Sequence, residues 1–182
     1  MLPYTVFERP GRGPFASVPS EPGGHTAGVN GVTIGRFGWA DPVSGQVSSS
    51  LIGPNQVLGF VLPQRDLYAR NGWNLAYWNA GALTLRKGVP LVLAAVGEFW
   101  TRFPLGCSIG QQVYANVIDG SAWTGIVESG EWTADSDFGT ADSPIYTADG
   151  GGYYVLTRFR TASRTTPNGL ALISTWQPAL SS

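Results

Sequence analysis

The stretch that decides the fold is residues 82–120, ALTLRKGVPLVLAAVGEFWTRFPLGCSIGQQVYANVIDG. Residues 89–96 are apolar at nearly every position, which is typical of a strand covered on both faces. In the next segment, residues 98–103, apolar and polar side chains alternate, so that one face is apolar and the other is charged. Residues 113–118 form a further predicted strand. This stretch therefore predicts several short strands in succession.

The sequence on either side repeats this pattern of short strands and turns. We expect the other strands at residues 31–40, 46–50, 57–61, 83–86, 123–127, 153–160 and 170–176. Asp119-Gly120 is a hairpin-type turn signal, and residues 46–50 are polar enough for an edge strand. A helical turn is expected only within residues 64–80. Many short strands separated by glycine and proline turns predict an all-β fold, a single-domain β-sandwich or barrel of jelly-roll-like type.

Two segments stand apart from the predicted sheets. Residues 1–30 are rich in proline and glycine, and we expect an extended arm that is ordered mainly by contact with a neighbour. Residues 31–182 then form the β domain. Within it, residues 128–152 are rich in Asp, Gly, Ser and Thr, which indicates a long acidic loop or hairpin insertion.

Charge and hydropathy exclude some classes of partner. The net charge is −1, which argues against binding nucleic acid through a basic surface. The longest apolar run, residues 89–96, is too short to cross a membrane as a helix. The N-terminal sequence does not resemble a signal peptide, so we expect a soluble protein made in the cytoplasm.

The charges are unevenly distributed. Ten of the eleven basic residues are arginine, which favours a protein interface or reflects a GC-rich genome. Seven acidic residues and no basic residue lie between Phe103 and Tyr154. This acidic run is either a solvated face or a surface that docks on a basic partner.

Catalytic chemistry finds little support in the sequence. His25 is the single histidine, and it lies in the glycine-rich arm, where nothing is expected to orient a general base. A carboxylate pair drawn from Glu98, Glu128 and Glu131 is the alternative, as in a glycoside hydrolase. Residues 135–139, DSDFG, begin like a calcium loop but lack its later ligands. We therefore expect no catalytic residue, no metal and no cofactor.

Cysteine and tryptophan give structural expectations. Cys107 is the single cysteine, so an intrachain disulfide is impossible, and its setting suits a small buried filler. We expect Trp39, Trp100 and Trp176 in the core, where each would bury a large apolar area. The interface candidates lie in the arm or outside the clearest strands, and they are Phe7, Phe15, Val18, Trp73, Trp78, Trp123 and Trp132. The four tryptophans among them suit either a protein interface or a sugar-binding platform.

An ordered set of motifs resembles one protein family. The motifs are GVTIGRFGWAD (31–41), VSS (47–49), LGFV (58–61), G-x-P-L-V-L-x-A-x-G-E-F-W (88–100), IGQQVYANVIDG (109–120) and ISTW (173–176). Together they resemble the structural cement proteins of tailed bacteriophages, which decorate the capsid. The resemblance covers most of residues 31–176.

The resemblance implies a non-enzymatic role in the virion. A protein of this family, made in the host bacterial cytoplasm, would bind the outer capsid surface and hold neighbouring major capsid proteins together against the pressure of the packaged DNA. Its partners would be the major capsid protein and other copies of itself, as a homo-dimer or homo-trimer at local symmetry axes, without direct contact with nucleic acid or membrane. The alternative is a carbohydrate- or receptor-binding module on the virion surface.

Overall fold

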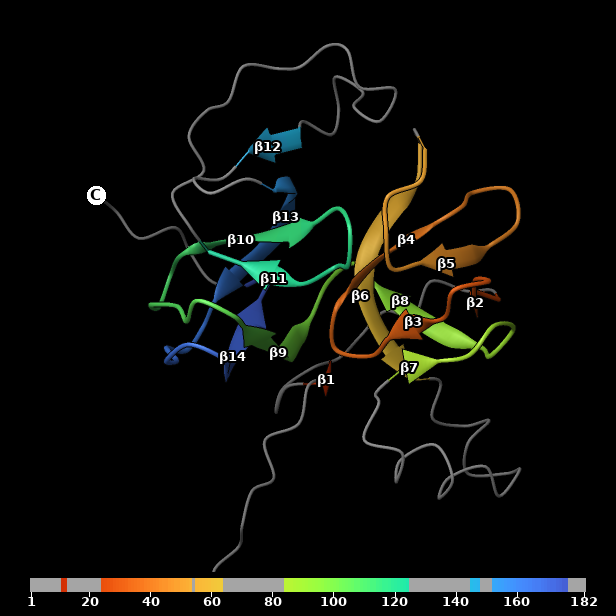
Figure 1. The fold of residues 1–182 in the computed structure, drawn as a ribbon. Helices are drawn as coiled ribbons and strands as arrows, with labels where there is room; N and C mark the ends of the chain where they lie inside the picture. The colour runs from red at the N-terminus through yellow and green to blue at the C-terminus, as the bar shows by residue number, and fades with distance from the viewer. Residues whose placement is uncertain are drawn as a thin grey trace, which may run out of the picture.

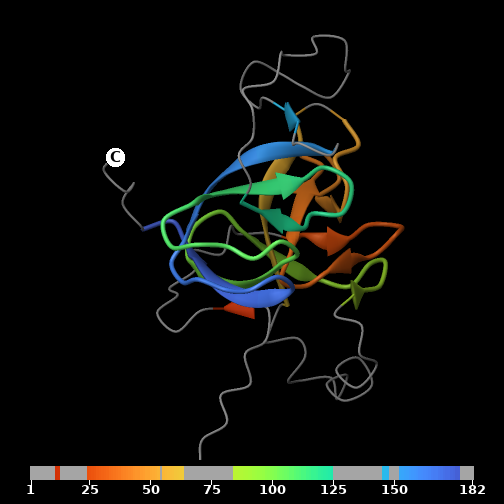
Figure 2. The ribbon, with the colours of Figure 1, turned by 60° about the vertical axis from the view of Figure 1, so that its left-hand side comes forward.

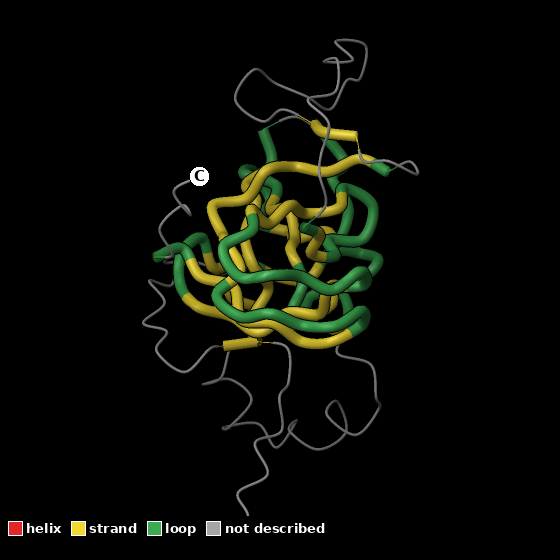
Figure 3. Tube along the Cα trace, turned by 90° about the vertical axis from the view of Figure 1, so that its left-hand side faces the viewer, coloured by secondary structure: helices red, strands yellow, loops and turns green. Residues whose placement is uncertain are grey.

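The chain folds as an all-β protein, as the sequence predicts. In the computed structural model the described residues are 11–12, 24–53, 55–63, 84–124, 145–147 and 152–176. Every regular element among them is a strand, and no helix is drawn in this part of the chain (Figure 3). The strands form a seven-stranded sheet, a five-stranded sheet and a two-stranded ribbon (Figure 1). The segment 64–80, where a helical turn is expected, lies outside the described residues.

The seven-stranded sheet is antiparallel throughout. Its strands, in spatial order, are β1 (Gly11–Arg12), β9 (Glu98–Phe103), β14 (Gly169–Ser174), β13 (Tyr153–Thr161), β10 (Gln112–Asn116) and β11 (Ala122–Trp123), and β12 (Ile145–Thr147) pairs with β13. Figure 2 shows β13 arching across the body before the chain returns through β14. Since β14 lies between β9 and β13, strands far apart in sequence become neighbours.

The five-stranded sheet curls into a small, nearly closed barrel. Its order is β2 (Thr26–Ala27), β5 (Gln46–Ser48), β4 (Phe37–Ala40), β6 (Val57–Pro63) and β8 (Leu91–Ala94). An isolated bridge from Thr26 to Pro90 joins its first strand to the start of its last. The hydrogen bonds from Ala27 N to Val89 O (2.9 Å) and from Leu91 N to His25 O (3.0 Å) complete the closure. The ribbon of β3 (Val32–Thr33) and β7 (Thr84–Leu85) lies alongside.

Two hydrophobic clusters lie on opposite sides of β4, β6 and β8. The first is the sandwich core between the two sheets, where the rings of Phe60 and Phe99 stack at 4.7 Å. The second fills the small barrel. Leu91 and Leu93 belong to the barrel cluster, whereas Ala94 belongs to the sandwich core. This arrangement explains why residues 89–96 are apolar on both faces.

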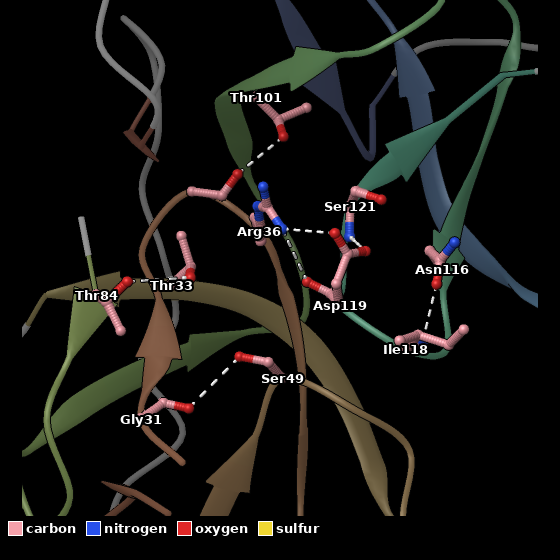
Figure 4. A network of polar contacts seen from close by, with 11 residues as sticks. Gly31, Thr33, Arg36, Ser49, Thr84, Thr101, Asn116, Ile118, Asp119 and Ser121 are labelled. Atoms are coloured by element: carbon pink, nitrogen blue, oxygen red, sulfur yellow. Dashed lines mark hydrogen bonds and ion pairs between the residues drawn. The ribbon is translucent and has the colours of Figure 1, made fainter. Parts of the chain in front are cut away.

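Polar contacts join the two sheets at one corner (Figure 4). Arg36 precedes β4, and its guanidinium donates a hydrogen bond to a carboxylate oxygen of Asp119 at 2.7 Å. The backbone N–H of Phe37 donates to the carbonyl of Gly120 at 2.8 Å. The Thr101 hydroxyl donates to the carbonyl of Gly35 at 2.8 Å. The predicted Asp119-Gly120 turn therefore also fastens the seven-stranded sheet to the barrel.

Several sequence expectations need correction. The predicted strand 31–40 is divided between β3 and β4, because Gly35 adopts a left-handed φ of +79° and redirects the chain. The predicted edge strand 46–50 is internal, since β5 has β4 on one side and β2 on the other. Trp39 is buried as expected, but Trp100 is only half-buried and Trp176 is 55% exposed.

The predicted arm lies mostly outside the described residues. Its described parts belong to the fold of this chain. Gly11–Arg12 pairs with β9, and Thr26–Ala27 pairs in parallel with β5. Ala27 is buried in the barrel cluster. The folded body therefore begins before residue 31.

Candidate functional site

The candidate site is the face of the seven-stranded sheet that points away from the sandwich core. Along β13, Val155, Thr157 and Phe159 are buried, so the alternating positions project outward. The same alternation holds in β9, β10 and β14. We call this surface the outer sheet face and define it by Trp100, Arg102, Tyr114, Trp123, Tyr154, Leu156, Arg158, Arg160, Leu170 and Leu172.

One end of the outer sheet face is aromatic. The rings of Trp123 and Tyr154 stack with their centroids 4.7 Å apart and their planes at 25°. Tyr114 lies opposite both Trp123 and Leu156 in the strand register. Leu156 is 42% exposed, and it extends this aromatic group toward the middle of the sheet. Side chains of this kind form the contact centres of many protein interfaces.

The other end of the face is apolar and basic. Trp100 lies opposite Leu172, and Arg102 lies opposite Leu170. Arg102 donates to the carbonyl of Asn168 at 2.8 Å, which fixes its guanidinium at the rim of the sheet. The half-buried Trp100 thus belongs to a surface cluster and not to the core in which it was expected.

A β-bulge in β13 positions the central arginine of the face. Gln112 lies opposite Arg160, whereas Tyr114 lies opposite Leu156, so β13 has two more residues than β10 over this span. The Gln112 amide donates to the carbonyls of Thr157 (2.8 Å) and Phe159 (3.0 Å), which satisfies the bulged backbone. Because the bulge adds an even number of residues, the side chains of β13 still alternate between the buried face and the outer face on both sides of it. Arg158 therefore projects outward from the bulge and is exposed.

Of the predicted interface residues, the structure describes only one. Trp123 lies on the outer sheet face, half-buried against Tyr154. The others lie outside the described residues, and they are Phe7, Phe15, Val18, Trp73, Trp78 and Trp132. Sequence reasoning did not single out Arg158, although the alternation of LTRFR at residues 156–160 was sufficient to place both of its arginines on one face.

Of the three carboxylates that the alternative hydrolase hypothesis draws on, only Glu98 lies among the described residues. Glu98 begins β9, and its Oε2 atom is buried without a hydrogen-bond partner in the described part of the chain. Glu128, Glu131 and the calcium-like segment 135–139 lie outside the described residues. Within the described ranges, no group of three or more His, Cys, Asp or Glu side chains could hold a metal ion.

His25 and Cys107 both have defined surroundings. A ring nitrogen of His25 lies 3.3 Å from the carbonyl of Gly45, so its ring has a fixed contact, contrary to the sequence expectation. Cys107 is half-buried and packs against the sandwich core, which agrees with its expected role as a small filler. Burial raises the pKa of the Cys107 thiol, which keeps the sulfur in its protonated, weakly nucleophilic form.

A shallow hollow of about 150 Å³ lies at one end of the barrel. Its lining includes residues 28–31, Asp41, Gln46 and Ile52. Asp41 accepts hydrogen bonds from two backbone N–H groups of its own turn, at 2.8 Å each, which lower the pKa of its carboxyl. The hollow is smaller than the roughly 300 to 1,000 Å³ of typical ligand pockets.

Comparison with protein-family models and with curated protein sequences finds no match. In the described ranges, none of the chain forms a helix long and apolar enough to span a membrane. The outer sheet face and the sequence motifs are therefore the features of this chain that bear on its function.

Proposed function

We propose that this protein is a structural cement protein of a tailed-bacteriophage capsid, which binds the outer surface of the head without performing catalysis. The observation that carries the proposal is the outer sheet face. It combines the half-buried Trp123, which stacks on the buried Tyr154, with the exposed Leu156 and Arg158. Aromatic side chains and arginine are enriched at protein interfaces relative to other protein surfaces.

The fold beneath this face suits a structural role. Phe99, Phe159 and Ile173 anchor the inner side of the same sheet in the sandwich core. The backbone that carries the outer side chains is therefore held by a packed layer and needs little rearrangement when a partner binds. A rigid contact face is what a protein needs to hold neighbouring capsid subunits in fixed positions.

Many copies on one head would act together. The affinity of each contact with the major capsid protein can be modest, because linked copies bind at a high effective concentration and their overall affinity is higher. We expect the copies to associate as symmetric dimers or trimers at local symmetry axes, because most homo-oligomers are symmetric. Sedimentation of the purified protein and of released capsid assemblies measures this directly.

The test uses heads of the encoding phage assembled without this protein. Purified protein is mixed with expanded heads and, separately, with unexpanded heads, and each sample is pelleted. We expect saturable co-sedimentation with expanded heads and higher resistance of those heads to heat or to loss of DNA. Protein that stays in the supernatant with expanded heads at all concentrations contradicts the proposal.

The alternative function is recognition of a carbohydrate or receptor on the host. The observation in its favour is the Trp123 and Tyr154 pair, because aromatic rings can stack on sugars. Tyr154 is buried, so the half-buried Trp123 is the ring on which a sugar would stack. Binding to a glycan array that is lost in a Trp123→Ala variant supports this alternative.

A further inference from the structure

We propose that the partner surface that docks on the outer sheet face carries carboxylates, and that Arg158 is the residue that anchors them. This inference rests on the proposed function, in which the partner is the major capsid protein. It adds the chemistry of the contact and the position of its centre.

The bulge gives Arg158 a position that a regular strand lacks. Three residues of β13, from Thr157 to Phe159, face the single residue Val113 of β10. The Thr157 hydroxyl donates to the carbonyl of Val113 at 2.8 Å, and the Gln112 amide binds the carbonyls on both sides of Arg158. The backbone around Arg158 is therefore fixed by side-chain hydrogen bonds. Bulges commonly re-aim a side chain at functional sites.

The described part of the face has an excess of positive charge. Arg158 and Arg160 project from alternate positions of the same strand, and Arg102 lies on β9. Glu98 is the one acidic side chain that alternation places on this side of the described sheet strands. Arg160 donates to the carbonyl of Gly110 at 3.1 Å, and Arg102 also donates to a backbone carbonyl. The described residues include no hydrogen-bond or ion-pair partner for Arg158.

Arg158 and Arg160 lie two residues apart on the same strand, so this part of the face is positively charged and favours an anion. A carboxylate suits the site because guanidinium binds it through two parallel hydrogen bonds. Leu156 and Leu172 also lie on the outer sheet face, and Leu156 precedes Arg158 by two residues on the same strand. A partner that covers these apolar groups also removes water from the ion pair, which strengthens it.

A protein carboxylate fits better than the phosphates of a nucleic acid. The chain has a net charge of −1, and seven acidic residues with no basic residue lie between Phe103 and Tyr154, just before Arg158. A net charge of −1 disfavours a partner that is a polyanion throughout. A discrete acidic patch on a protein, surrounded by apolar side chains, matches the face without that penalty.

The test measures binding of full-length variants to expanded heads at fixed salt. Arg158→Glu should weaken binding by roughly 30-fold or more, the loss expected when one member of a buried charge pair is removed. Arg158→Lys should bind with intermediate affinity, because it keeps the charge and loses the two-pronged geometry. Lys87→Glu is the matched control, since it makes the same change of charge on an exposed turn after β7, outside the outer sheet face. Lys87→Glu should bind within about twofold of the parent, and all variants should unfold at the same urea concentration.

The outcomes separate this inference from the proposed function. If the parent binds heads and Arg158→Glu binds equally well, the inference is wrong and the proposed function stands. If the parent does not bind heads, both fail. Binding of the parent to duplex DNA that Arg158→Glu abolishes would identify a phosphate partner and overturn the inference. Parent oligomers that Arg158→Glu dissociates, with head binding unchanged, would identify a second copy as the occupant and overturn it as well.

Discussion

Replacing Gly120 with alanine should loosen the joint between the two sheets. Gly120 has a left-handed φ of +68°, and a Cβ atom there would overlap the carbonyl oxygen of Phe37. A left-handed conformation costs a residue with a Cβ about 1 to 2 kcal/mol. Relief of the overlap requires the turn to move away, which breaks the hydrogen bond from Phe37 N to Gly120 O and costs about 1 kcal/mol more. We therefore expect a loss of about 2 to 3 kcal/mol in the free energy of unfolding.

Gly88→Ala is the matched control for this prediction. Gly88 has a φ of +78°, but no atom lies within 4 Å of the position that its Cβ would occupy. Only the conformational cost applies there, so we expect a loss of about 1 to 2 kcal/mol, which is about 1 kcal/mol less than for Gly120→Ala. Urea unfolding followed by tryptophan fluorescence measures both variants, with the slope m checked against the parent. Equal losses of stability for the two variants would show that the close approach of Gly120 to Phe37 does not hold the two sheets together.

Three further predictions address the core and two titrating groups. Phe60→Ala, which removes a fully buried ring stacked on Phe99, should cost about 3 to 5 kcal/mol in urea unfolding, whereas Trp176→Ala should change stability by less than about 0.5 kcal/mol. Backbone N–H groups bind the Asp41 carboxylate and lower its pKa in the folded protein below the ordinary value of 3.8. The ionised carboxylate therefore stabilises the fold at pH values above 3.8, and this contribution is lost as the pH falls through the lower pKa of the folded state. Between about pH 5 and pH 2 the free energy of unfolding of Asp41→Asn should therefore fall less than that of the parent. Urea titrations at the two pH values measure both changes, and equal changes for variant and parent would contradict this. Because burial raises the pKa of Cys107, its thiol should react with iodoacetamide more slowly at pH 8 in the native protein than in urea, and equal rates would show that the sulfur is not shielded.

Local pattern was sufficient for the strands whose faces differ clearly. The alternation of residues 98–103 correctly placed Phe99 and Phe103 on the buried face of β9. The apolar run of residues 89–96 correctly predicted a strand with a core on each side. In both cases the exposure of each side chain follows from its own position in the strand period.

The errors arose where non-local contacts decide the outcome. In residues 31–40 the apolar positions shift by one at Gly35, from Val32 and Ile34 to Phe37 and Trp39, and the prediction of one strand passed over this shift. The chain turns there, and the Gly35 carbonyl accepts a hydrogen bond from the Thr101 hydroxyl of the other sheet. Trp176 follows the end of β14, where the hydroxyl of Ser174 accepts a hydrogen bond from its backbone N–H. A strand pattern alone does not indicate that the sheet has already ended.

The candidate site was predictable only in part. The strand at residues 153–160 was expected, and its alternation implies that Leu156, Arg158 and Arg160 share a face. The bulge opposite Val113 was not predictable, because it depends on the register between β10 and β13. The position of β14 between β13 and β9, which adds Trp100 to the same surface, is also a consequence of topology and not of local sequence.

A cryo-electron microscopy reconstruction of expanded heads saturated with this protein would show directly which of its surfaces meets the capsid. We predict that the outer sheet face contacts the major capsid protein, with Arg158 within hydrogen-bonding distance of an aspartate or glutamate of that protein. We also predict that the small barrel formed by β2, β5, β4, β6 and β8 points away from that contact. A reconstruction in which the outer sheet face is open to solvent, while another surface holds the protein on the head, would contradict this assignment.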